Sequence, residues 1–164
     1  MIRIGVAAVL AAVFLTSPSF AADIVTVHRL SAALAGEAVM AAVATCAQQG
    51  YSVTAVVVDT DGVQQATLRG DTAAIHTMEA AYDKAYTSMT SRVDTLALVE
   101  RQKAGTLPPV MLRPLDHLLV GQGGLVIKIG NETVSAIGVS GGPGGDKDEA
   151  CARAGLERIR SRLN

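Results

Sequence analysis

The sequence predicts an α+β fold, in which helices flank an antiparallel sheet of roughly five strands. Two pairs of short apolar runs are each separated by a glycine-containing turn signal, which indicates two β-hairpins. Segments with helical periodicity lie before the first hairpin, between the two hairpins and after the second. Strands joined by hairpins, with helices between and around them, indicate a sheet packed against helices.

The first half of the chain contains a helix and a hairpin. An alanine-rich segment over about 29–49 has apolar residues at helical spacing, and Gly50 follows as its end signal. Residues 52–58 and 63–69 are the predicted strands, with the turn Thr60-Asp61-Gly62 between them. Because this helix is apolar almost all round, we expect burial on more than one side, for which a homo-oligomer interface is one solution.

Two helices and an irregular segment separate the hairpins. Asp71 or Thr72 is expected to cap a helix that runs to about Thr90, and a shorter helix covers about 93–102. Three prolines then predict an extended connection, followed by a short strand near 118–119. The longer helix is expected to bury a stripe of large residues, Ile75, Met78, Tyr82, Tyr86 and Met89.

The most informative segment is the second hairpin with the glycine-rich corner behind it. After Gly123-Gly124, the runs LVIKI and TVSAIGVSGG are separated by Gly130-Asn131, which can reverse the chain at positive φ. The loop GGPGGDKDE leads into a last helix from Asp146 to about Leu163, with Glu149 placed as the capping partner of Asp146. Its inward residues are expected to be Ala152, Leu156, Ile159 and Leu163.

The glycines of this corner have two interpretations. Glycine between a strand and a helix allows the backbone to pack closely, which is its more common use. Exposed amides beside a helix start also form a site for an anion or for the carboxylate of a ligand.

Several motifs together resemble one known family. GGL, SAIGVSG, GG, DE and CARAGL, preceded by VVVDTDGVQQATLRGD and EAAYDKAYT, resemble the GlcG/HbpS-like haem-binding family, which includes the C-terminal domain of PduO-type proteins. The resemblance covers roughly residues 30–163. The chain departs from the pattern at Val126, where many relatives carry proline, and this departure bears on the shape of the pocket rim.

The resemblance implies a profilin-like α/β/α sandwich, an oligomer and haem as the cofactor or ligand. The implied function is an exported protein that binds haem or a related tetrapyrrole for sequestration, sensing or breakdown. The alternative is a periplasmic small-molecule enzyme, or an accessory protein of a catabolic pathway, that binds an organic acid in the same glycine-rich pocket. No catalytic residue is assigned, because the chain lacks a nucleophile elbow, a CxxC motif and a zinc-ligand spacing.

The N-terminus has the parts of a secretory signal. Arg3 precedes an apolar run from Ile4 to Leu15, and Ser19-Phe20-Ala21 forms a small-residue cleavage site. We therefore expect residues 1–21 to be the signal peptide, with Ala22 as an alternative last residue, and 22–164 to be a single periplasmic or secreted domain without a membrane anchor. An uncleaved anchor is the alternative, although the run is short for a membrane span.

Charge and composition argue against nucleic acid as a partner. The chain has 14 Lys and Arg against 15 Asp and Glu, so it has no strong basic field. Aromatic residues make up only 3% and tryptophan is absent, which leaves few platforms for base stacking.

The two cysteines lie near the end of the first helix and the start of the last. In an oxidising compartment Cys46 and Cys151 can pair and restrict the unfolded state. Cysteine is also a common small core residue, and the resemblance favours packing at Cys151.

His28, His76 and His117 are the candidate axial ligands for haem iron. No two of them have the spacing of a metal-ligand pair on a helix, and each has an ordinary structural explanation. His117 ranks first because it lies in the proline-rich connection, where loops tend to line a pocket. Tyr82 and Tyr86 are one turn apart and can ligate ferric haem, although their stripe is more typical of core.

Two basic residues are candidates to hold a propionate or a small carboxylate. Arg69 ends the second strand, and Lys84 lies in the second helix, where it can alternatively form a surface pair with Asp83. We expect the ligand between the glycine-rich corner and this helix, with Arg69 and His117 at the rim. The predicted ligand-binding residues are Arg69, His76, Lys84, His117, Gly123, Gly124, Ser140, Gly141 and Gly142.

Overall fold

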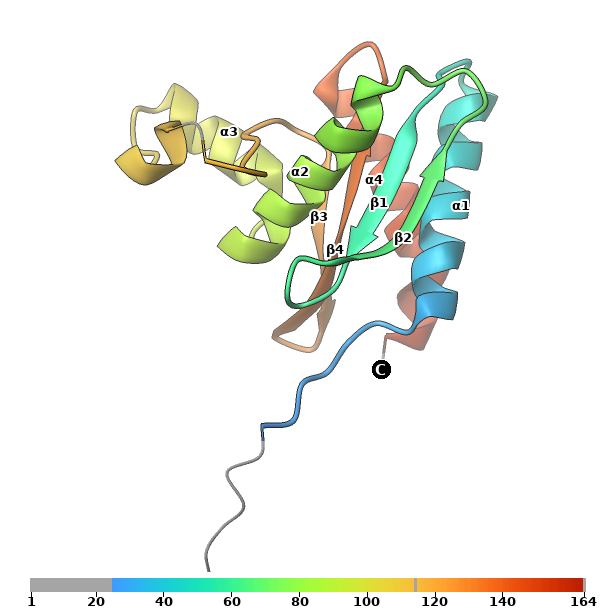
Figure 1. Ribbon diagram of the computed structural model, residues 1–164, viewed down its shortest axis with the longest axis horizontal. Coiled ribbons are helices and arrows are strands. Elements are labelled where there is room, and N and C mark those ends of the chain that lie inside the picture. The colour runs from blue at the N-terminus through green and yellow to red at the C-terminus, as the bar shows by residue number, and fades with distance from the viewer. Residues whose placement is uncertain (1–24, 114, 164) are drawn as a thin grey trace, which may run out of the picture.

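Four antiparallel strands form the sheet of the described part of the chain, in the order β2-β1-β4-β3 (Figure 1). A computed structural model describes residues 25–113 and 115–163. The strands are β1 (Thr54–Val58), β2 (Gln64–Arg69), β3 (Gly124–Ile129) and β4 (Glu132–Ser140). Both predicted hairpins are confirmed, since β1 pairs with β2 and β3 with β4, and β1 also pairs with β4.

Helices cover both faces of this sheet (Figure 1). α1 (Ala32–Gln48) and α4 (Gly145–Ile159) lie together on one face, and α2 (His76–Ser91) lies on the other. α3 (Thr95–Lys103) and the 3-10 turn at Pro109–Leu112 project beyond α2, and a second 3-10 turn at Arg160–Arg162 follows α4. The predicted α+β class, with its α/β/α layers, is therefore confirmed.

The number of strands was overestimated by one. Within the described residues, the segment near 118–119 forms no strand. The Leu119 N–H donates instead to Oγ1 of Thr87 on α2, at 2.8 Å. The segment is thus bound to a helix and does not extend the sheet.

A hydrophobic core lies on each face of the sheet, and successive side chains of β1 point alternately into one core and the other. Ala55 and Val57 belong to the core under α1 and α4, whereas Val56 and Val58 belong to the core under α2. This explains why β1 is apolar from Ala55 to Val58, because a strand covered on both faces needs no polar side.

The layer formed by α1 and α4 is covalently linked. Cys46 on α1 and Cys151 on α4 form a disulfide, and both residues are fully buried. The packing interpretation favoured from the sequence was therefore incomplete, because the two cysteines are bonded as well as buried. Four residues that were expected to face inward from the last helix do so: Ala152 and Ile159 are buried, and Leu156 and Leu163 pack partly buried against the same core.

α2 presents a different face to the sheet from the one predicted. Its buried side is made of small or polar residues and Met89, whereas Ile75 is 71% exposed and Met78 is 39% exposed. The reason lies in Gly138 on β4, where a Cβ atom would lie 2.1 Å from the carbonyl oxygen of Ala81. The helix approaches the strand so closely that only small side chains fit between them.

Two predicted helix caps were wrong. α2 begins at His76, and neither Asp71 nor Thr72 caps it. α4 begins at Gly145, after an extended Gly144 that makes no side-chain capping bond, so Asp146 is not the N-cap. Glu149 pairs with Arg153 at 2.7 Å instead of closing a capping box.

The segment after α2 is anchored to β3 by two side chains. Thr95 Oγ1 accepts the Gly124 N–H at 2.9 Å, and Asp94 accepts the Val126 N–H at 2.9 Å. A proline at position 126 has no N–H to donate, so the departure from the family pattern has a structural role in this chain.

The predicted signal peptide, residues 1–21, lies outside the described residues. Among the helices of residues 25–113 and 115–163, none combines the length and apolar character needed to cross a membrane.

Candidate functional site

Four of the predicted ligand-binding residues meet in one pocket at the glycine-rich corner. His76, Ser140, Gly141 and Gly142 all line a pocket of about 560 Å³. We call it the corner pocket; its other lining residues are Gly50, Tyr51, Ser52, Thr72, Ala74, Thr77, Pro143 and Asp148. The end of β4 and the start of α2 thus come together as expected.

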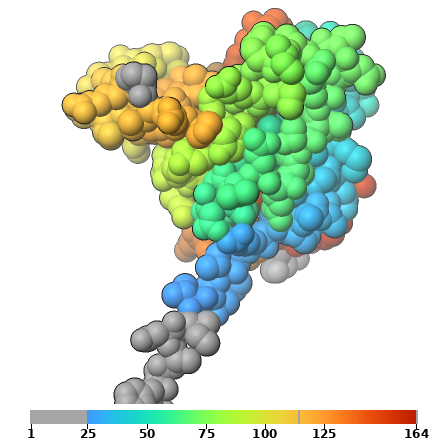
Figure 2. Space-filling view, viewed as in Figure 1, coloured from blue at the N-terminus to red at the C-terminus, as the bar shows by residue number. Residues whose placement is uncertain are grey.

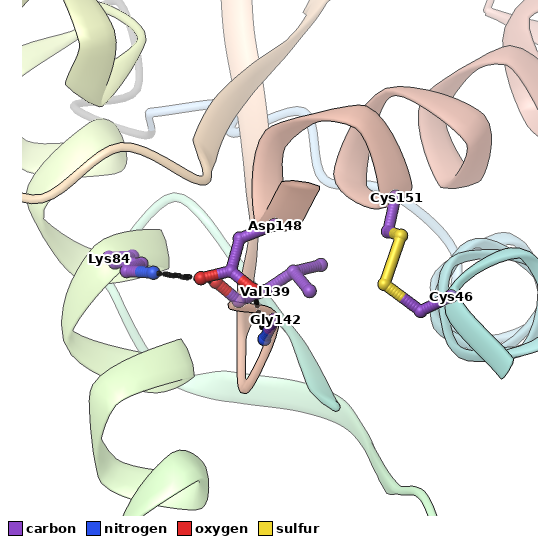
Figure 3. Close-up of a disulfide and its surroundings, with 6 residues drawn as sticks. All are labelled: Cys46, Lys84, Val139, Gly142, Asp148 and Cys151. Carbon is purple, nitrogen blue, oxygen red and sulfur yellow. Dashed lines mark hydrogen bonds and ion pairs between the residues drawn. A yellow bond between two sulfur atoms is a disulfide. The ribbon is translucent and has the colours of Figure 1, made fainter. Parts of the chain in front are cut away.

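Lys84 is buried beside this pocket and is not free to hold a ligand. Its Nζ donates to Oδ2 of Asp148 at 2.7 Å and to the carbonyl oxygen of Val139 at 3.0 Å (Figure 3). Oδ1 of Asp148 accepts the Gly142 N–H at 2.8 Å. The alternative of a surface pair with Asp83 was wrong, because Lys84 instead links α2 to the start of α4 and the end of β4.

The surroundings of Asp148 have opposing effects on the pKa of its carboxyl group. Burial raises the pKa of this carboxyl, while the hydrogen bond and charge of Lys84 and the Gly142 amide lower it. Gly123 lies against the same pair, and a Cβ atom there would be 2.8 Å from the carbonyl oxygen of Val139. Gly124 is similarly close to the α2 backbone, so both glycines serve close packing.

Arg69 and His28 lie elsewhere. Arg69 donates through Nε to the carbonyl oxygen of Ala73 at 2.8 Å and lines a groove on the α1 side of β2, apart from His117. His28 is exposed and lies 2.9 Å from the carboxylate of Glu132. The three candidate histidines therefore occupy three separate places.

His117 packs against two neighbouring tyrosines of α2. Its ring centroid lies 4.8 Å from that of Tyr82 and 5.7 Å from that of Tyr86, both in edge-on geometry. Its Nδ1 lies 3.1 Å from Oδ1 of Asp83. We call Tyr82, Tyr86 and His117 the ring cluster.

The backbone at His117 is held in an unusual conformation. Its φ of 64° places a non-glycine residue in the left-handed region. Thr87, which is fully buried, donates to the His117 carbonyl oxygen at 3.3 Å and accepts the Leu119 N–H at 2.8 Å. These two bonds fix the segment on α2, and such conformations persist where the surroundings determine them.

Two hollows flank the ring cluster. The outer pocket, of about 470 Å³, is lined by Gln64, Thr67, Met78, Glu79, Tyr82 and His117. A second, apolar pocket of about 350 Å³ shares Tyr86 with the cluster and is lined by Tyr86, Thr90, Ser91, Met111, Leu115, Asp116 and Leu118. The segment that supplies Met111 and Leu115 is the yellow-to-orange lobe that projects beside α2 in Figure 2.

Sequence reasoning missed Asp83, Thr87 and Asp148. The spacing of Asp83, Tyr82 and Tyr86 along α2 does not indicate a shared site. These residues contact His117 only because a loop more than thirty residues away folds back onto the helix. Within the described residues, no cluster of three or more His, Cys, Asp and Glu side chains is arranged to hold a bare metal ion.

A family model described as "Haem degrading protein HbpS-like" matches residues 30–157. The chain belongs to the HbpS-like family. The resemblance inferred from the motifs is thereby confirmed. Comparison with curated protein sequences gave no match.

Several solved structures share the fold of this HbpS-like chain. A double mutant of HbpS from Streptomyces reticuli is 30% identical, with a TM-score of 0.77 over 87% of this chain and 94% of that one. The protein ORFY from Klebsiella pneumoniae is 22% identical, with a TM-score of 0.78 over 87% and 99% of the two chains. PduOC, solved as a haem complex, is 23% identical, with a TM-score of 0.73 over 80% and 95%.

Proposed function

We propose that this protein is an exported haem-binding protein that holds the iron through His117. Membership of the HbpS-like family supports haem as the ligand. The placement rests on the ring cluster: of the three histidines, His117 is the one that packs edge-on against two aromatic rings at the wall of a pocket.

The side chains of the ring cluster suit haem iron. Histidine and tyrosine both serve as protein ligands of haem iron. Burial raises the pKa of Tyr82, and Tyr86 and Asp83 add to this effect, so the phenol keeps its proton at neutral pH. A neutral imidazole binds iron without losing a proton, whereas a phenol must lose one, so His117 is the proposed donor and the two tyrosines pack against its ring.

Apolar surface for the porphyrin lies along the outward side of α2. Met78 and Tyr82 line the outer pocket, and Ile75, the residue before α2, is exposed three residues before Met78. The volume of the outer pocket lies within the range of small-molecule sites. Bound haem would supply an iron centre capable of electron exchange, which sensing and breakdown of haem would use.

Titration of the purified apoprotein with haemin tests this function. The wild-type protein should give a saturable Soret shift, and His117→Ala should remove or change that spectrum. His76→Ala and His28→Ala are matched controls, because those histidines lie in other places, and both should retain the wild-type spectrum. Unchanged spectra in His117→Ala, with the fold intact by circular dichroism, would contradict the placement.

Export is part of the proposal. The support is the signal-like sequence of residues 1–21, and cleavage is expected after Ala21 or Ala22. Mass spectrometry of the protein recovered from the periplasm or medium should show a chain that begins at Ala22 or Asp23. Recovery of a chain that retains Met1 would contradict export by cleavage.

The corner pocket supports a second candidate function, the binding of a small organic acid. His76, Ser140 and the backbone of Gly141 and Gly142 share this polar pocket. Calorimetry with short mono- and dicarboxylates should then give binding that His76→Ala weakens and His117→Ala leaves unchanged. Absence of heat with all of these acids would eliminate this candidate.

A further inference from the structure

Asp83 contacts the ring of His117 from the same helix that carries both tyrosines. Its Oδ1 lies 3.1 Å from Nδ1 of His117, and its side chain is only 18% exposed. The His117 side chain is 47% exposed, so the carboxylate covers one edge of the imidazole while part of the ring remains open. His117 also lines the outer pocket, where the ligand is proposed to lie.

The chemistry of this contact selects one tautomer of His117. A carboxylate oxygen facing Nδ1 is an acceptor, so this contact favours the tautomer that carries its proton on Nδ1. In the neutral imidazole, Nε2 then keeps its lone pair and is able to bind a metal. Tyr82 and Tyr86 pack edge-on against the ring, and Thr87 fixes the backbone, so rotation of the ring is restricted on several sides.

We propose that Asp83 is a positioning residue that makes Nε2 of His117 the iron donor and strengthens its donation to ferric haem. This inference rests on the proposed haem-binding function. A carboxylate that accepts the Nδ1 proton fixes the ring and raises the basicity of the ligating nitrogen, as in other carboxylate–histidine–metal arrangements. A more basic ligand favours the ferric over the ferrous state, so Asp83 would also lower the reduction potential of a haem held by His117.

The test compares Asp83→Asn with the wild-type protein. The substitution keeps the shape of the side chain and removes its charge. Asp71→Asn is the matched control, because Asp71 is an exposed carboxylate before α2 that lines neither pocket of the ring cluster. Three quantities are measured: the His117 ring tautomer in the apoprotein by nitrogen-15 NMR, haemin affinity by Soret titration, and the reduction potential of the haem-loaded protein.

In the apoprotein, we expect the wild type and Asp71→Asn to carry the proton on Nδ1, and Asp83→Asn to lose this preference. Haemin affinity should fall about 10- to 100-fold in Asp83→Asn, the usual effect of removing such a partner. The reduction potential should shift to a more positive value, and Asp83→Glu should restore part of both changes.

The outcomes separate this inference from the proposed function. If Asp83→Asn matches Asp71→Asn in tautomer, affinity and potential while His117→Ala still loses the Soret spectrum, the role of Asp83 is refuted and haem binding at His117 stands. If the wild-type protein gives no saturable Soret shift, both proposals fail. Circular dichroism of Asp83→Asn shows whether a loss of affinity comes from unfolding.

Discussion

Lys84 and Asp148 join α2 to the start of α4 at a point where both side chains are almost completely buried. Two charges in such a place are costly to desolvate, and each depends on the other for compensation. Because Lys84 also bonds the end of β4, the pair holds three elements together behind the corner pocket.

Removal of either charge should therefore destabilise the protein strongly. Lys84→Met or Asp148→Asn is expected to lower the free energy of unfolding by about 3 to 5 kcal/mol, because the remaining partner is left buried without a counter-charge. The double variant should lose less free energy of unfolding than the two single variants lose together. Urea denaturation measures these values, with Lys103→Met in the exposed Lys103–Glu100 pair as a control that stays within about 1 kcal/mol of the wild type.

Gly138 sets the distance between α2 and the sheet. A Cβ atom there would lie 2.1 Å from the Ala81 oxygen and 2.6 Å from the Ala85 nitrogen, both in the helix backbone. Gly138→Ala should therefore lower the free energy of unfolding by about 1 to 3 kcal/mol or more.

Gly36→Ala is the matched control for Gly138→Ala. Gly36 lies inside α1 with open space around its Cβ position, so the same substitution there should stabilise the protein by about 0.5 to 1 kcal/mol. Equal effects of the two substitutions on the melting temperature would contradict the close approach.

At the scale of elements, the two hairpins were predictable because their turns are determined locally. Gly62 and Gly130 adopt the positive φ that their turn signals indicated. The orientation of α2 was not predictable from its own periodicity, since large apolar residues normally face a core. The face of α2 with small side chains, including Ala81 and Ala85, faces the sheet because it packs against Gly138. That glycine lies more than fifty residues later in the sequence.

The candidate site also has a part that could be predicted from the sequence and a part that could not. The glycine-rich corner was found from sequence, because strand, loop and helix start are consecutive there. The ring cluster was not, since it requires Thr87 and Asp83 to hold a loop in a left-handed conformation. Such contacts between distant segments leave no periodic pattern in a single sequence.

The disulfide between α1 and α4 should contribute substantially to stability. It closes a loop between residues 105 positions apart, and loss of a cross-link of this kind costs about 2 to 5 kcal/mol. We expect reduction to lower the urea midpoint by a corresponding amount. Comparison of the reduced protein with the Cys46→Ala, Cys151→Ala double variant separates the cross-link from the lost side-chain volume, and an unchanged midpoint on reduction would contradict this role.

At the scale of the whole molecule, the outward side of α1 remains apolar. Met40 is 56% exposed, and several exposed alanines lie on the same helix. Since exposed apolar surface of this kind commonly marks an interface, we propose that the protein self-associates through α1.

Analytical ultracentrifugation tests this association. The mature protein should sediment as an oligomer at micromolar concentration, and Met40→Glu should shift it towards the monomer with an unchanged circular dichroism spectrum. Val63→Glu, at a comparably exposed apolar residue in the β1–β2 turn, is the control and should remain associated. A wild-type monomer under these conditions would refute self-association.

α1 is synthesised first and α4 last, yet the two lie side by side under one face of the sheet. During synthesis, or during passage through a membrane from the N-terminus, α1 and β1 emerge long before the helix that completes their layer. Until Gly145 and the residues after it have emerged, Val57, Ile137 and Val139 lack part of their cover. We therefore expect this face of the nascent chain to be prone to aggregation until α4 has emerged, and the Cys46–Cys151 bond to form only after that.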